Sequence, residues 1–110
     1  MKENKNIERR RSTCQGIQLL YRARKAGIEE HEREIQNLLS EYHNSLSPQK
    51  IQALRERNQA EINRLNLLLT ENRKLLEYHR GNKSRKEQEL NDLQNDYQFN
   101  DCSLITGSID

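Results

Sequence analysis

A single proline, Pro48, interrupts a chain that otherwise has a helical sequence pattern throughout. Ser47 is a favourable N-cap residue, and Pro48 would then occupy the first helical position, where its missing N–H group costs little. A helix that ends near Asn44 and a second that starts near Pro48 would be joined by very few residues. Because connections this short favour antiparallel neighbours, the sequence predicts a helical hairpin.

The composition predicts a helical chain without a globular core. Charged residues make up 33% of the 110 residues and hydrophobic residues 32%, and there is no tryptophan. Glu, Lys, Arg, Gln and Leu are strong helix formers, and the apolar residues recur at helical intervals. We therefore predict an all-α fold, an antiparallel two-helix coiled-coil hairpin with a disordered C-terminal tail.

The pattern divides the chain into five segments. They are a flexible N-terminus (1–5), a first long helix (6–44), a turn (45–48), a second long helix (49–97) and a flexible tail (98–110). The tail is predicted because the apolar period is lost there and Asn, Asp, Ser and Gly accumulate. The longest apolar run, residues 67–69, is too short to span a membrane, and the first residues are charged. We therefore expect a cytoplasmic protein with no direct membrane insertion.

Apolar side chains spaced three or four residues apart form a seam on both predicted helices. A turn at residues 46–47 would place residues whose numbers sum to about 93 side by side in the hairpin. Tyr21 would then face Asn72, and Cys14 would lie near His79. Asn58 and Asn72 are predicted to lie in the seam, where polar residues fix the register at some loss of stability.

The sequence contains no recognisable catalytic or metal-binding motif. Cys14 and Cys102 lack CxxC or metal-ligand spacing, so free thiols in a reducing compartment are expected. His31, His43 and His79 have no His or Cys partner three or four residues away. There is no GxSxG elbow, glycine-rich phosphate loop or HExxH motif. We expect no enzymatic activity, no cofactor and no metal ion.

Lys and Arg are concentrated in two stretches that the predicted hairpin would bring to its open end. Residues 1–25 hold eight Lys or Arg and two Glu, whereas residues 92–110 hold four Asp and no Lys or Arg. The predicted basic cluster comprises Arg9, Arg10, Arg11, Arg80, Lys83, Arg85 and Lys86. Such a cluster is either a solvated helix face or a site for an acidic protein surface or a nucleic acid. No nucleic acid is expected, because zinc-finger spacing, a basic region with an uninterrupted zipper and aromatic stacking residues are lacking.

Residues of the first predicted helix, and others at the predicted turn, carry a family resemblance. They are Arg10-Arg11, Cys14-Gln15-Gly16-Ile17, Leu20-Tyr21, Gly27-Ile28, the run Glu29-Glu30-His31-Glu32-Arg33-Glu34-Ile35, and Ser45-Leu46-Ser47 followed by Ile51, Leu54 and Arg55. Over roughly residues 9–95 the chain resembles the InvI/SpaM proteins of virulence type III secretion systems, relatives of the YscO and FliJ stalk proteins.

The resemblance implies a cytoplasmic central stalk at the cytosolic face of a bacterial secretion apparatus. Such a coiled coil sits in the pore of a hexameric type III secretion ATPase, bridges it to the export gate protein and, in some relatives, binds secretion chaperones. We assign the predicted basic cluster to the ATPase. The apolar tip assigned to the export gate comprises Leu39, Tyr42, Leu46 and Ile51. The alternatives are a generic coiled-coil adapter or oligomerisation protein and, less favoured, a basic nucleic-acid-binding hairpin.

Overall fold

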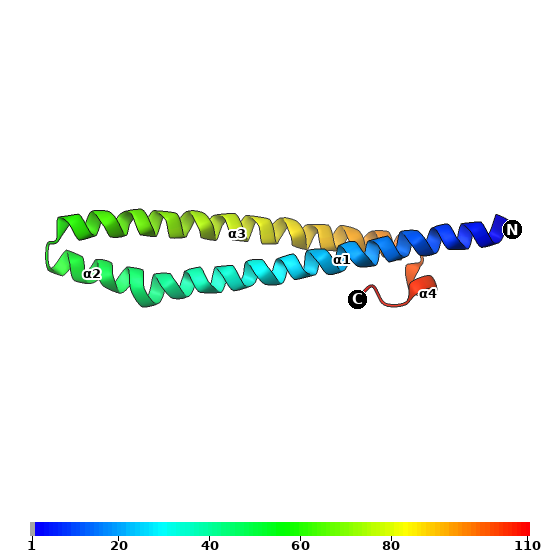
Figure 1. The fold of residues 1–110 in the computed structure, drawn as a ribbon, viewed down its shortest axis with the longest axis horizontal. Coiled ribbons are helices and arrows are strands. Elements are labelled where there is room, and N and C mark those ends of the chain that lie inside the picture. The colour runs from blue at the N-terminus through cyan, green and yellow to red at the C-terminus, as the bar shows by residue number, and fades with distance from the viewer. Residues whose placement is uncertain (1) are drawn as a thin grey trace. The chain divides into compact units, whose positions relative to one another are not determined.

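The computed structural model describes the backbone of residues 2–110 and the side chains of residues 6–110, so Met1 lies outside the described residues. The elements are α1 (Lys2–Glu41), the π-helical turn η1 (Tyr42–Leu46), α2 (Ser47–Arg55), α3 (Gln59–Phe99) and α4 (Cys102–Thr106) (Figure 1). The described chain contains no strand, which confirms the predicted all-α class. No helix among the described residues combines the length and apolarity that crossing a membrane requires.

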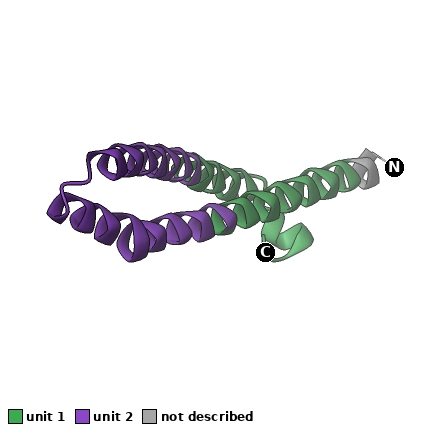
Figure 2. Ribbon diagram, turned by 60° about the vertical axis from the view of Figure 1, so that its left-hand side comes forward, with its two compact units in different colours: residues 1–29, 84–110 green, residues 30–83 purple. Residues whose placement is uncertain are grey.

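The described residues form two compact units (Figure 2). Unit 1 combines the chain up to residue 29 with residues 84–110, and unit 2 comprises residues 30–83. Helices α1 and α3 each contribute to both units. The helix α1 begins at Lys2, before the predicted start at residue 6, and the side chains of the N-terminal segment predicted to be flexible (1–5) lie outside the described residues.

The predicted turn at residues 45–48 is wrong, because these residues are helical. In a regular α-helix the Pro48 ring would clash with the carbonyl group of Asn44, and proline has no N–H to donate. The helix widens into η1 just before this point, where the N–H of Ser47 donates to the carbonyl oxygen of Tyr42. Pro48 then lies in the first turn of α2, which its fixed φ angle suits.

The chain leaves α2 at residues 56–58 instead. The N–H of Arg57 donates to Leu54 O at 3.2 Å and the N–H of Asn58 donates to Ala53 O at 3.0 Å, which is the pattern of a Schellman motif. Arg57 holds the left-handed position of this motif, with φ of 56°. Asn58 then caps α3, because its Oδ1 accepts the N–H of Glu61 at 3.2 Å. Asn58 is therefore an exposed cap and not the seam residue predicted.

Moving the connection changes which residues of α1 and α3 meet. In unit 2, the side-chain amide of Asn72 donates to Leu38 O at 3.0 Å, and Asn72 is 5% exposed, which confirms its predicted place in the seam. The predicted pairing of Tyr21 with Asn72 and of Cys14 with His79 is wrong, because the connection lies ten residues further along the chain than the predicted turn at 46–47. One buried cluster of this unit consists of Leu46, Ala53 and Leu65, with Ile62 and Leu69 packed against it.

In unit 1 the C-terminal residues are attached to α1. A disulfide bond joins Cys14 to Cys102, both of which have no exposed surface, so the expectation of free thiols is wrong. The bond connects residues 88 positions apart, a proximity that their spacing could not reveal. Ile17 and Tyr97 form a buried cluster with the two cysteines, and Leu93, Ile105 and Ile109 pack against this cluster.

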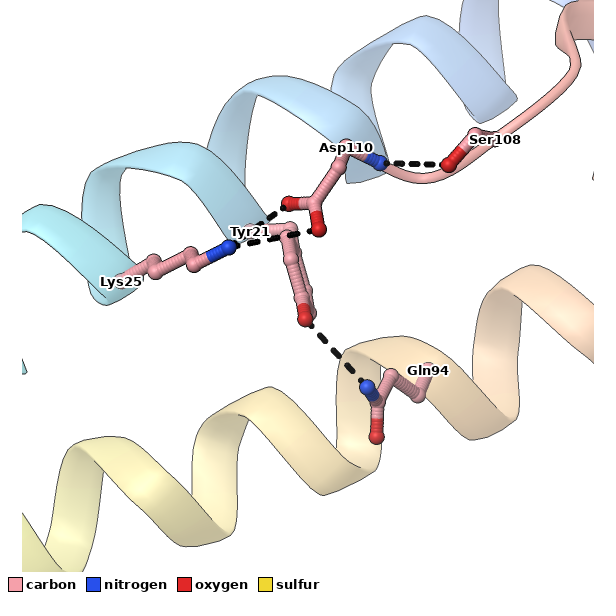
Figure 3. A network of polar contacts seen from close by, with 5 residues as sticks. All are labelled: Tyr21, Lys25, Gln94, Ser108 and Asp110. Atoms are coloured by element: carbon pink, nitrogen blue, oxygen red, sulfur yellow. Dashed lines mark hydrogen bonds and ion pairs between the residues drawn. The ribbon is translucent and has the colours of Figure 1, made fainter.

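Polar contacts hold the last residues in the same unit. Gln18 Nε2 donates to Ser108 O at 2.8 Å, and the Tyr97 hydroxyl donates to Gly107 O at 2.6 Å. Lys25 Nζ lies 3.3 Å from a carboxylate oxygen of Asp110, close to the hydrogen bond between Tyr21 and Gln94 (Figure 3). The segment predicted to be a disordered tail, residues 98–110, thus carries the end of α3, the helix α4 and a hydrogen-bonded terminus.

Candidate functional site: a basic groove beside the π-helical turn

A groove of about 520 Å³ lies in unit 2 next to η1. It is bounded by the end of α1, by η1 and α2, and by one face of α3. The residues that line it are Leu39, Tyr42, His43, Lys50, Asn66, Leu69, Thr70, Asn72, Arg73, Leu76 and Arg80. We refer to this surface as the basic groove.

Helical spacing places the α3 residues of the basic groove on one face. Asn66, Leu69, Arg73, Leu76 and Arg80 succeed one another at steps of three or four residues, so their side chains project to the same side. Across from them, the π-helical turn carries the two ring side chains that line the groove, and the rings pack edge to face with centroids 5.1 Å apart.

The lining of the basic groove combines apolar and cationic side chains. Lys50, Arg73 and Arg80 line it together with His43, and no Asp or Glu is among the lining residues. Cations that converge on a concave surface raise the local concentration of anionic partners, and Arg side chains bind carboxylates through paired hydrogen bonds. Leu69 and Leu76 add apolar area between these cations. The groove is therefore suited to an acidic protein segment that also presents apolar side chains.

The basic cluster predicted at the open end of the hairpin is divided between the two units. Arg10 lies in unit 1, where its guanidinium donates to Asn100 O at 3.3 Å and lies 3.9 Å from a carboxylate oxygen of Asp101. Lys83 and Arg80 lie in unit 2, and Lys83 Nζ is 3.3 Å from a carboxylate oxygen of Glu32. The predicted residues of the cluster thus separate between the two units, because their predicted meeting depended on the misplaced turn.

The remaining predicted cations all lie in unit 1. Arg9 and Arg11 are exposed on α1, and Arg85 and Lys86 are on α3. The Lys86 side chain lies over Gly27, where a Cβ atom would come within 3.2 Å of it. Gly27 and Arg10 are 17 residues apart on α1, about 25 Å at the rise of an α-helix, so Lys86 and Arg10 occupy different levels of the unit.

The predicted apolar tip is also divided by the structure. Leu46 is only 4% exposed and belongs to the core of unit 2, so it is not a surface contact. Leu39 and Tyr42 line the basic groove. Ile51 is 49% exposed on α2 and lies outside the groove. The sequence analysis therefore identified Leu39 and Tyr42 as surface residues of a binding site, but placed them on a different surface from Arg80.

Sequence reasoning missed the meeting of two histidines. His31 on α1 and His79 on α3 lie in unit 2 with their Nδ1 atoms 2.8 Å apart. No sequence signal reveals this pair, because the two residues belong to different helices and meet only in the observed register. Within the described residues, no group of three or more His, Cys, Asp or Glu side chains is arranged to hold a metal ion.

Comparison of the chain with protein-family models, with curated proteins and with solved structures found no match. The functional assignment therefore rests on the residues themselves and on the surfaces that they form.

Proposed function

We propose that the chain is a non-enzymatic central stalk of a type III secretion system, as its resemblance to the InvI/SpaM proteins implies. In this proposal it acts in the bacterial cytoplasm, inserts into the hexameric secretion ATPase and couples the ATPase to the export gate. The proposal does not require the disulfide bond of Cys14 with Cys102, because the cytoplasm keeps most cysteines reduced. Binding of secretion chaperones, which occurs in some relatives, belongs to the same proposal.

The proposed stalk is an antiparallel two-helix coiled coil. Within unit 2, residue numbers fall along α1 as they rise along α3, from Leu38 with Asn72 to His31 with His79. Within unit 1 the same order holds, from Arg24 with Glu89 to Gln18 with Tyr97. These contacts support an arrangement in which the apolar seams of two long helices pack on each other.

The basic groove is the observation that carries the proposed partner binding. Arg73 and Arg80 offer two planar cations on one face of α3, and the neighbouring apolar residues would bury the apolar side of a bound segment. We assign this groove to an acidic segment of the secretion ATPase. Ile51 and Leu54, which are 49% and 52% exposed on α2, are the apolar residues assigned to the export gate.

Co-elution and ATP turnover with the purified hexameric ATPase test the proposal. The double variant Arg73→Glu with Arg80→Glu should lower the affinity for the ATPase by more than about tenfold, because it reverses the charge of two groove residues. Co-elution with the ATPase should be reduced accordingly. The matched control reverses Arg22 and Arg33, which are exposed, lie outside the groove and change the net charge equally. Reversal of Arg9, Arg10 and Arg11 tests the contribution of unit 1.

Stimulation of ATP turnover or co-elution by the wild-type chain is the expected result. If an ATPase shown to be hexameric neither co-elutes with the chain nor turns over ATP faster in its presence, the stalk assignment is refuted. Equal loss of binding in the groove variant and in the Arg22 and Arg33 control would show that net charge, not the groove, governs the interaction.

A coiled-coil adapter that associates with itself is the second candidate. Leu67, Leu75 and Tyr78 on α3 are 71%, 47% and 61% exposed, which is more apolar surface than a helix pair needs to leave in water. Light scattering of the purified chain separates the candidates. A dimer that Leu75→Glu with Tyr78→Glu converts to a monomer would favour the adapter, whereas a monomer at the same concentration would favour the stalk.

A further inference from the structure

The two histidine rings of unit 2 face each other across α1 and α3. The Nδ1 atoms of His31 and His79 are 2.8 Å apart, the ring centroids are 5.1 Å apart and the ring planes meet at 51°. Both residues are half-buried, so solvent reaches one side of the pair. Nitrogen atoms at this distance share one proton in a hydrogen bond or coordinate one metal ion.

Each metal geometry sets its own separation between two ligand nitrogens. Two nitrogens bound at about 2.0 Å to one metal lie roughly 2.8 Å apart when the angle at the metal is about 90°, and roughly 3.3 Å apart when the angle is tetrahedral. The observed 2.8 Å is the length of an ordinary hydrogen bond between two nitrogens, and neighbouring positions of a square-planar or tetragonal ion would require little change in this separation. Among divalent ions that favour imidazole, Cu²⁺ and Ni²⁺ adopt this geometry and Zn²⁺ favours the tetrahedral one.

The surroundings hold the two rings at one level. Glu32 Oε1 and Lys83 Nζ form an ion pair of 3.3 Å between the same two helices, so the charges of these neighbours compensate each other. Asn72, about two turns from His79 along α3, fixes the register through Leu38. Since the described residues supply no third ligand, water would complete the coordination on the open side.

We propose that His31 and His79 form a two-histidine site for a divalent, tetragonal metal ion, Cu²⁺ or Ni²⁺, that clamps α1 to α3. Binding through both Nδ1 atoms requires two neutral rings that each carry their proton on Nε2. The ring that donates the Nδ1–H in the hydrogen-bonded pair therefore moves its proton to Nε2, and the metal takes the place of the shared proton. The site does not depend on the proposed stalk function.

Electron paramagnetic resonance of the oxidised full-length chain with one equivalent of Cu²⁺ tests the site. A tetragonal signal with hyperfine splitting from two nitrogen nuclei is expected. His31→Gln or His79→Gln should weaken Cu²⁺ binding by about a hundredfold or more, because one ligand loses the effective concentration of the other. His43→Gln is the matched control and should bind Cu²⁺ as the wild type does, since His43 is the third histidine of the chain and lies in the basic groove.

Nuclear magnetic resonance of the wild type provides a test that needs no substitution. Cu²⁺ should broaden the ring signals of His31 and His79 at lower concentration than those of His43, and Ni²⁺ should raise Tm in the wild type. Equal broadening of all three histidines would overturn the proposal, as would undiminished Cu²⁺ affinity in folded His31→Gln and His79→Gln. Tighter binding of Zn²⁺ than of Cu²⁺ would overturn the tetragonal geometry.

Discussion

Asn72 and Leu38 are joined by a hydrogen bond of 3.0 Å from the buried side-chain amide of Asn72 to the backbone carbonyl oxygen of Leu38. Asn72 is the one buried polar residue found among the described side chains. A polar group in an apolar seam favours the register in which it finds its partner and lowers stability relative to an apolar residue. This bond therefore explains why α1 and α3 meet in one alignment within unit 2.

Replacing Asn72 with leucine should raise the free energy of unfolding by about 1 kcal/mol while weakening the preference for one register. Urea unfolding monitored by circular dichroism measures the first effect, and the number of amide signals in a nuclear magnetic resonance spectrum measures the second. Asn66→Leu is the matched control, because Asn66 is exposed on the same helix and its replacement should change stability by less than about 0.5 kcal/mol. A lower stability of Asn72→Leu would contradict this account.

Reduction of the bond between Cys14 and Cys102 should lower the free energy of unfolding by about 4 kcal/mol. The reason is the large number of residues, 88 along the chain, whose unfolded freedom the cross-link restricts. Urea unfolding with and without a reductant measures the loss. The variant Cys14→Ser with Cys102→Ser should have the same free energy of unfolding as the reduced wild type, with or without the reductant. A change in the stability of that variant on adding the reductant would show that the reductant acts at another site.

Replacing Arg57 with glycine should stabilise the chain by about 0.5 kcal/mol. The left-handed conformation at φ of 56° costs a side-chain-bearing residue about 1–2 kcal/mol, which exceeds the entropic cost of glycine of about 0.5–1 kcal/mol. Thermal unfolding measures the change. Arg55→Gly, two residues earlier in the last turn of α2, should instead destabilise by about 1 kcal/mol. Destabilisation by both substitutions would contradict the role assigned to Arg57.

The ion pair at the start of α3 should make stability depend on pH. Hydrogen bonds from the Arg64 guanidinium hold the pKa of the Glu61 carboxyl below its ordinary value of 4.5. A lowered folded-state pKa stabilises the fold above the ordinary value, and the contribution is lost as the pH falls through the lowered pKa. The urea midpoints of the wild type and Glu61→Gln should therefore differ most at neutral pH and converge as the pH falls through the lowered pKa, below 4.5. The difference between the midpoints should be small because Glu61 is near the surface. A difference that grows as the pH falls would contradict a stabilising role of the ion pair.

The helices were predictable from the sequence, whereas the connection between them was not. Periodic Leu and Ile residues and strong helix formers predicted long helices, but Ser47 and Pro48 also satisfy the pattern of a helix start. The structure accommodates them inside a continuous helical stretch through η1. The true end at Arg57 lacks the glycine that usually marks the left-handed position. One available signal was overlooked, since Asn58 followed three residues later by Glu61 fits the capping pattern of a helix start.

The error in the connection propagated to every contact between distant residues. The disulfide, the pair of His31 and His79 and the assignment of Arg10 and Arg80 to different units all depend on the register, which a shift of ten residues changes completely. Asn72 was identified correctly as a seam residue because burial follows from the period of one helix alone. Properties of single helices could therefore be predicted from the sequence, whereas the sites formed between two helices could not.

The bond between Cys14 and Cys102 also changes how the chain would bear mechanical load. It closes a covalent ring that contains all of unit 2 and the connection at residues 56–58. Tension applied between residues before Cys14 and residues after Cys102 would pass through the sulfur atoms, and the ring between them would carry none of it. Such tension could unwind α1 before Cys14 or α4 after Cys102, whereas the helices inside the ring would stay unloaded for as long as the cysteines stay oxidised.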